Sequence, residues 1–364
     1  MQVILIGAGR YGNALVGKKH KDGIFNTQLN AVVDPRINEI STQTDYTMGD
    51  TPKYTSFNQI PKEKITKDTI VEIAVNPEII PALFNELAQN NIKNVILPKP
   101  VATKQDDYQQ LIKTANNHNI RTAVTSNWYY SDITKLTKAI LQKVQGKKIT
   151  DRFIANKYKP ELDNLPKKFK IEKVELEYNK KHEKLDIDPP AQELPHALQI
   201  INATGLCNYK DVSFQLPSEK QSHSAVNVKF KNVKGIKEGI TINSDLQMGD
   251  KLEKNRERVL KIYLNDDDPQ ADIITDYDAV FDKAGLCIKP ANILVDITKN
   301  GKTTKWKKII WEDNLNVMYQ DIIGYFENKI PNVATLKNYE LISKYICAIQ
   351  SIWEKIVKNP SEKD

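Results

Sequence analysis

The sequence has few cysteines and histidines and no long apolar run. Its 364 residues include 3 Cys and 5 His, and Cys207, Cys287 and Cys347 stand too far apart for a disulfide framework or a metal motif. No stretch approaches the ~20 apolar residues that a membrane span needs. The opening "MQVILIGAGRYG" enters a strand and a glycine turn, unlike a signal peptide. These absences argue against a secreted disulfide scaffold, a metal site and a membrane segment, and they predict a cytoplasmic protein.

The charge balance does not predict a nucleic-acid-binding protein. Lys and Arg number 53 against 46 Asp and Glu, which gives a net charge of +7. The basic residues are spread along the chain, with small clusters at 17–21 and 305–308, whereas a nucleic-acid site concentrates them on one element. A solvated basic surface is the simpler explanation. The chain is long enough for two domains.

The first 126 residues alternate strand-like and helix-like segments. Helical patterns lie at 77–91 and 103–119 between short apolar runs. Such alternation is typical of βαβ units and predicts a doubly wound parallel sheet. The expected strands are 2–7, 29–34, 69–75, 94–97 and 121–126.

Residues 127–364 have a different texture. After a helix expected at 131–145, segments with alternating polarity follow, at 151–158, 173–178, 225–233, 258–265 and 293–309. Asn300-Gly301 between two such runs is a hairpin signal. We therefore expect an α+β domain with an open, mostly antiparallel sheet. A helix at 191–205 interrupts it, and two helices at 315–329 and 336–358 close the chain, the last packing back on the first domain.

The glycine turn "GAGRYG" predicts a dinucleotide site. Gly7, Gly9 and Gly12 have the G-x-G-x-x-G spacing between an apolar strand and a helical pattern. Asp34 ends the next strand, where a carboxylate would bind the adenosine ribose of NAD. Arg36 keeps NADP open as an alternative. The expected cofactor-binding residues are Gly7, Ala8, Gly9, Arg10, Tyr11, Gly12, Asp34, Arg36, Asn76, Pro77 and Lys99.

Lys99 lies between Pro98 and Pro100 at the end of the apolar run "NVIL". In a doubly wound sheet this position shares the ligand-binding edge with the glycine turn and with Asn76. Pro100 favours extended geometry at Lys99, and a cis bond before it is possible. We expect the ammonium group to reach a substrate oxygen, with a pKa lowered by partial burial.

Together, "GAGRYG", "ILPKPVATK" and the closing segment 319–354 resemble the Gfo/Idh/MocA oxidoreductases along essentially the whole chain. The family's hallmark is Glu-Lys-Pro, so the resemblance gives Lys99 the role of contacting nicotinamide ribose and substrate, while Pro98 replaces the glutamate. The family also carries Asp-x-x-x-His on a helix. Here His196 matches the histidine, and Gln192 and Gln199 stand where the family often has carboxylates.

The resemblance makes His196 a candidate proton acceptor or donor for the substrate. Glu193, next to Gln192, is an alternative source of negative charge if the helix starts differently. Pro195 suits a first helical turn, which predicts a helix start within 191–195. A histidine that only packs is the alternative. The expected substrate-binding residues are Gln192, Glu193, Gln199, Asn127, Trp128 and Tyr130, of which the last three follow the strand at 121–126 and could equally be core.

The resemblance implies an NAD-dependent oxidoreductase that transfers hydride to or from a sugar, nucleotide sugar or cyclitol. It further implies a homodimer or homotetramer with a small-molecule substrate, without nucleic acid or membrane. Because amides replace the family's carboxylates, two alternatives stay open: reduction of a C=N bond, and a dinucleotide-binding sensor without turnover. Lysines in 157–173 hint at an anionic substrate, although solvated lysines explain them as well.

Overall fold

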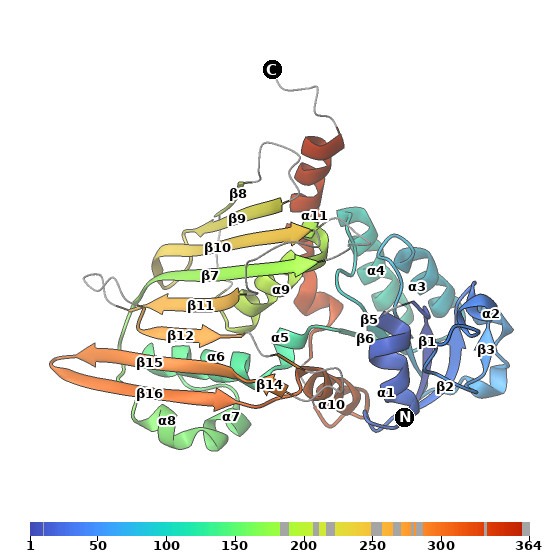
Figure 1. The fold of residues 1–364 in the computed structure, drawn as a ribbon, viewed down its shortest axis with the longest axis horizontal. Coiled ribbons are helices and arrows are strands. Elements are labelled where there is room, and N and C mark those ends of the chain that lie inside the picture. The colour runs from blue at the N-terminus through green and yellow to red at the C-terminus, as the bar shows by residue number, and fades with distance from the viewer. Residues whose placement is uncertain are drawn as a thin grey trace. The chain divides into compact units, whose positions relative to one another are not determined.

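The computed structural model describes most of the chain and divides it into two compact units (Figure 1). Unit 1 comprises Met1–Ser126 and Leu315–Ala348, and unit 2 comprises Asn127–Asn314 and the segment from Ile349. The residues described are 1–9, 11–182, 189–206, 211–215, 223–248, 257–264, 271–277, 280–281, 287–330 and 333–358.

Unit 1 contains the predicted parallel sheet, drawn mainly in blue in Figure 1. The strand order is β3-β2-β1-β4-β5-β6, so β1 to β3 extend the sheet to one side and β4 to β6 extend it to the other. In such sheets the ligand crevice lies between β1 and β4, where the order changes side. Every neighbouring pair is parallel. The strands are β1 (Gln2–Ile6), β2 (Gln28–Val33), β3 (Lys53–Tyr54), β4 (Ile70–Ile73), β5 (Asn94–Leu97) and β6 (Arg121–Val124).

The helices of unit 1 include a C-terminal pair that comes from far along the chain. Leu336 N donates to Thr122 Oγ1 at 3.2 Å, and Val124 N donates to Ala334 O at 2.6 Å, so this segment is bonded to β6 and its neighbourhood. The elements are η1 (Tyr11–Gly17), α1 (Lys18–Lys21), α2 (Ile37–Ile40), η2 (Phe57–Gln59), η3 (Lys62–Lys64), α3 (Ile80–Gln89), α4 (Gln105–His118), α10 (Asn314–Phe326) and α11 (Leu336–Lys358).

Unit 2 is built on an eight-stranded sheet in the order β16-β15-β12-β11-β7-β10-β9-β8. All neighbours are antiparallel except β7 and β10, which confirms the mostly antiparallel sheet. Asn300 and Gly301 join β15 to β16 with φ of 50° and 74°, as a tight hairpin requires. The strands are β7 (Ile171–His182), β8 (Asp211–Gln215), β9 (His223–Lys231), β10 (Ile236–Met248), β11 (Glu257–Tyr263), β12 (Ile273–Asp276), β15 (Ala291–Lys299) and β16 (Lys302–Ile310); β13 (Val280–Phe281) pairs with β14 (Cys287–Lys289).

Two expectations for unit 2 were wrong. Residues 151–158 were expected as a strand, but Asp151 accepts a hydrogen bond from Ile154 N at 3.0 Å and begins a helix. The helix expected to start within 191–195 begins at Pro189, because consecutive prolines suit a helix start, and Pro195 lies inside it. The helices are α5 (Asn127–Tyr130), α6 (Asp132–Val144), α7 (Arg152–Lys157), α8 (Lys159–Asp163) and α9 (Pro189–Ala203). No helix in the described part of the chain is long and apolar enough to span a membrane.

Glu312, which follows β16, is expected to make the stability of unit 2 depend on pH. Both of its carboxylate oxygens accept from Asp132 N at 2.9 Å. Burial, and next the nearby Asp132 charge, raise the pKa of Glu312 to about 7, while Lys135 and Lys157 act in the opposite direction. The folded state therefore holds a proton that the unfolded state releases between the ordinary pKa and about 7.

Because the pKa is raised on folding, we expect the free energy of unfolding of unit 2 to fall as the pH rises from 5 to 8. The loss should be about 1–2 kcal/mol, discounted for partial solvent access. Urea titrations across this range measure it. Glu312→Gln should flatten this part of the profile, and an unchanged slope in that variant would assign the effect to another group.

Candidate functional site

The glycine turn closes tightly on the end of β4. Gly7 has φ of +103°, and a Cβ atom there would lie 2.4 Å from Ala74 O. A Cβ atom on Gly12 would lie 2.0 Å from Gly7 O. The chain's own packing therefore requires glycine at both positions.

Gly9 differs from its two partners. Apart from its two chain neighbours, no described residue has an atom within 4 Å of the place that its Cβ would take, and its φ is not in the left-handed range. Neither the fold nor the backbone of the protein therefore requires glycine here. An open approach to the backbone at the middle glycine is what a dinucleotide pyrophosphate needs. The turn thus fits such a cofactor. Arg10, expected in this set, lies outside the described residues.

Asp34, directly after β2, accepts a hydrogen bond from the backbone of the same turn. Its Oδ2 atom accepts from Ala8 N and its Oδ1 atom from Arg36 N, both at 2.8 Å. The side chain of Arg36 is exposed. A carboxylate has about four acceptor positions, so two backbone bonds leave capacity for a ribose hydroxyl. That contact stays a prediction.

The remaining predicted unit 1 residues follow the ends of β4 and β5. Asn76 is exposed and Pro77 is buried, and Lys99 is half-buried with a cis peptide bond to Pro100. Because carboxyl ends of parallel strands share one edge, these residues and the glycine turn lie along the same edge of the sheet. The role of the Lys99 ammonium stays a prediction.

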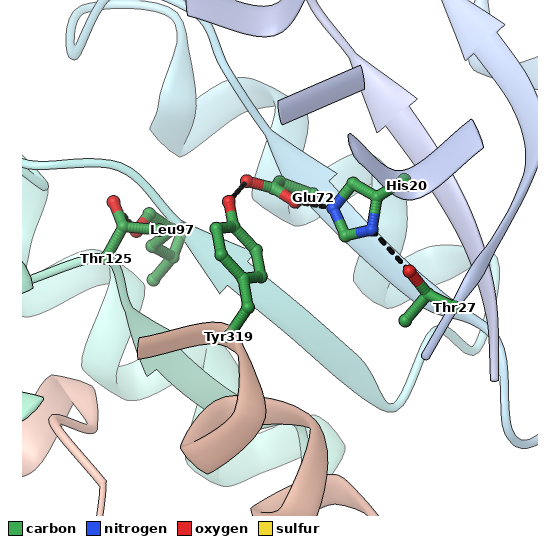
Figure 2. Close-up of polar contacts among 6 residues, drawn as sticks. All are labelled: His20, Thr27, Glu72, Leu97, Thr125 and Tyr319. Carbon is green, nitrogen blue, oxygen red and sulfur yellow. Dashed lines mark hydrogen bonds and ion pairs between the residues drawn. The ribbon is translucent and has the colours of Figure 1, made fainter. Parts of the chain in front are cut away.

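A buried polar network lies beneath this edge (Figure 2). Glu72, on β4, is 0% exposed; its Oε2 contacts His20 Nε2 at 2.7 Å, and its Oε1 accepts from the Tyr319 hydroxyl. His20, which is also 0% exposed, bonds through Nδ1 to Thr27 Oγ1 at 2.6 Å. Phe25 stacks on the Tyr319 ring at 3.9 Å between centroids. The network fixes α10 to the centre of the parallel sheet.

Tyr11 joins this network to the glycine turn. Its phenol lies close enough to Tyr319 and Thr125 for their hydroxyl groups to lower its pKa. Burial and the charge of Glu72 raise the pKa of both Tyr11 and Tyr319, so both phenols stay protonated. Since a carboxylate only accepts, Tyr319 donates to Glu72. The Tyr11 phenol therefore lies beside the buried network of Glu72 and Tyr319 within unit 1.

In unit 2, α9 brings the predicted residues next to β7. Glu193 is 1% exposed and Gln199 is fully buried. Tyr178, on β7, donates its hydroxyl to Glu193 Oε2 at 3.3 Å and stacks on the ring of half-buried His196 at 6.4 Å between centroids. The side chain of Gln192 lies outside the described residues. His196 thus has an aromatic neighbour, and its proton-transfer role stays a prediction.

The aromatic residues after β6 are buried in unit 2. Trp128 and Tyr130 are 5% and 1% exposed, and Trp128 meets Tyr277 edge to face. Asn127 is half-buried. The two rings therefore pack in the core of unit 2, and their contact with a substrate stays a prediction.

Several residues of these clusters were not predicted from the sequence, among them Glu72, His20, Tyr178 and Tyr319. Glu72 carried a usable signal, because a charged residue inside the apolar run "TIVEIAV" needs a buried partner. Tyr319 carried none, since its partner Glu72 is 247 positions away in the sequence. Unit 2 also has two hollows of about 240 Å³ and 100 Å³, which are lined by none of the predicted site residues that the structure describes. Lys147, just after α6, lines both, and Lys143 and Lys167 line the first.

The N-terminal segment of unit 1 matches a known protein family. Residues 1–126 match the model of an oxidoreductase family with an NAD-binding Rossmann fold, GFO_IDH_MocA. An uncharacterized Saccharomyces cerevisiae protein, YMR315W, is 32% identical over 95 residues, which cover 23% of this chain and 27% of that protein. The relative is therefore matched over about a quarter of its length.

Solved structures share the fold of nearly the whole chain. An Agrobacterium radiobacter oxidoreductase, in complex with NAD+, L-tartaric acid and magnesium, has a TM-score of 0.63 at 13% identity and covers 95% of this chain and 94% of its own. UDP-N-acetylglucosamine 3-dehydrogenase from Acidithiobacillus ferrooxidans scores 0.61 at 14% identity, covering 96% and 97%. A super-repressor mutant of Gal80p from S. cerevisiae scores 0.62 at 14% identity, covering 97% and 96%.

The parallel sheet, its reversal between β1 and β4, the open glycine and the family match agree with one another. Residues 1–126 of this chain therefore match the NAD-binding Rossmann domain of the Gfo/Idh/MocA oxidoreductase family.

Proposed function

We propose that the protein is a cytoplasmic NAD-dependent oxidoreductase acting on a hydroxyl or carbonyl carbon of a sugar, nucleotide sugar, cyclitol or related small molecule. The observation that carries the proposal is the open approach at Gly9, on the sheet edge that also holds Lys99. The bound nicotinamide supplies the hydride chemistry. NADP is the second choice, because the carboxylate of Asp34 disfavours a 2′-phosphate.

In this proposal Lys99 and His196 handle the substrate oxygen and its proton. Lys99 stands at a strand end beside two prolines, so its backbone is well fixed. His196 is held against Tyr178 on α9. The family's carboxylates are absent at Pro98, Gln192 and Gln199, which also suits reduction of a C=N bond, because that reaction needs a proton donor more than a base. By the family resemblance, we propose a homo-oligomer.

A regulatory protein is the second candidate. A super-repressor mutant of Gal80p shares this fold, so the fold alone does not separate enzyme from regulator. The three missing carboxylates favour this candidate. Both candidates bind dinucleotide, and turnover separates them.

The first experiment is a thermal-shift titration with NAD+, NADH, NADP+ and NADPH. A ligand at ~100 times its Kd adds about 2.7 kcal/mol of stability, which is a readily visible shift. We expect the NADH response to exceed the NADPH response. Binding without turnover on a panel of sugars, cyclitols and cyclic imines would favour the regulator, and no response to any cofactor would refute both candidates.

Lys99→Met is expected to lower kcat about 10²–10⁴-fold, since it removes the proposed proton-handling group while keeping much of the side-chain length. The Kd for NADH should change less than about tenfold. Steady-state kinetics and NADH fluorescence measure the two effects. Lys104→Met, on an exposed lysine of the same unit, is the control. An unchanged kcat would remove Lys99 from the chemistry.

A further inference from the structure

Arg258 is a buried arginine held between aromatic rings of unit 2. It lies on β11 directly opposite Tyr178 of β7, and the side chain is 4% exposed. The guanidinium carbon is 5.2 Å from the Tyr178 ring centroid and 5.6 Å from that of Trp128. Aromatic faces at this range attract the cation and fix the plane of the group.

The hydrogen-bonding capacity of this group is not filled. Within the described part of the chain, Arg258 Nε is buried and has no hydrogen-bond partner. A guanidinium carries five N–H donors in a rigid fork, and ring faces accept them poorly. Keeping a buried cation in this state is unfavourable unless an anion completes it.

The carboxylate bonded to the same tyrosine does not complete it. Glu193 accepts from the Tyr178 hydroxyl at 3.3 Å. It leaves Nε without a bond. The same ring stacks on His196, so the guanidinium lies one aromatic ring away from the residue proposed to handle the substrate proton.

We propose that Arg258 binds an anionic oxygen group, a carboxylate or a phosphate, on the substrate. The planar fork matches two oxygens of such a group, and the rings of Trp128 and Tyr178 hold the fork in place. The inference rests on the proposed function, in which α9 carries the substrate-facing histidine, and it narrows the substrate to sugar acids, sugar phosphates and similar anions.

Calorimetric titration tests this with three probes of matched size: D-glucuronate, D-glucose 6-phosphate and D-glucose. Each probe is titrated into the full chain, without and with saturating NADH. We expect saturable binding of at least one anionic probe and none of D-glucose. The stronger anionic probe distinguishes a carboxylate site from a phosphate site.

Arg258→Gln should weaken the anionic probe at least tenfold. Arg258→Lys, which keeps the charge but loses the fork, should weaken it by a smaller factor and guards against misfolding of the first variant. The matched control is Lys173→Gln. Lys173 lies over the Tyr263 ring at 4.2 Å on the same sheet, at a half-buried position of β7 that alternates with the buried ones.

Equal binding by wild type and both Arg258 variants would overturn the proposal, and so would tighter binding of D-glucose than of either anion or no binding of any probe. Loss of binding in Lys173→Gln as well would reduce the effect to net charge and would also overturn it. Failure of NADH to bind the wild type would instead defeat the proposed function, because the titrations without NADH still report on Arg258.

Discussion

Gly9→Val is expected to weaken NAD(H) binding about a hundredfold or more, equivalent to about 3 kcal/mol, and to leave the ligand-free fold intact. The reason is the contrast among the three glycines. In the described part of the chain, no residue beyond the two neighbours of Gly9 has an atom near its Cβ position, whereas that position at Gly12 lies 2.0 Å from Gly7 O. A branched side chain at Gly9 would therefore fill the space that the pyrophosphate needs without disturbing the packing of the chain.

NADH fluorescence titration measures the affinity, and the thermal midpoint of the ligand-free protein measures the fold. Gly12→Ala is the matched comparison, because it should lower the thermal midpoint itself. Normal NADH affinity in Gly9→Val would mean that the pyrophosphate does not pass over this turn. A large loss of midpoint in that variant would mean that the open space is structural.

Glu72→Leu is expected to destabilise unit 1 by about 3–5 kcal/mol, because it removes the carboxylate to which two buried side chains are bonded. His20 and the Tyr319 hydroxyl would both lose the oxygens that they now contact, in a place where water does not replace them. Urea unfolding followed by circular dichroism measures the loss.

Glu72→Gln is the control for this prediction. Its amide oxygen can accept from Tyr319, and its amide nitrogen can donate to an unprotonated His20. We therefore expect it to recover much of the stability lost in Glu72→Leu. Equal losses in the two variants would show that the charge, and not the hydrogen-bond pattern, is what the network needs.

The sequence allowed the parallel sheet, the glycine turn and the hairpin at Asn300-Gly301 to be predicted, because each depends on local patterns: apolar runs, glycine spacing and turn residues. The prolines misled in one place, since Pro195 led to a predicted helix start within 191–195, whereas α9 begins at Pro189. Asp151 misled in another, because a cap bond outweighs an alternating pattern.

The side-chain clusters could not be predicted in the same way. Glu72 and Tyr319 are 247 positions apart, and Arg258 and Tyr178 meet only through the register of two strands. Such pairs follow from tertiary packing, which no single stretch of sequence encodes. Lys99→Met tests the role predicted for Lys99, and the comparison of NADH with NADPH tests the ribose contact predicted for Asp34.

Unit 1 is discontinuous along the chain, and this has a consequence for how the protein is made. The match to the family model ends at residue 126, yet the Tyr319 hydroxyl donates a hydrogen bond to Glu72, and Leu336 N donates one to Thr122. The 188 residues Asn127–Asn314 of unit 2 are synthesised between these two parts of unit 1. Unit 1 can therefore be completed only after they have been made, and residues 1–126 expressed alone would lack the hydrogen bonds from Tyr319 and Leu336.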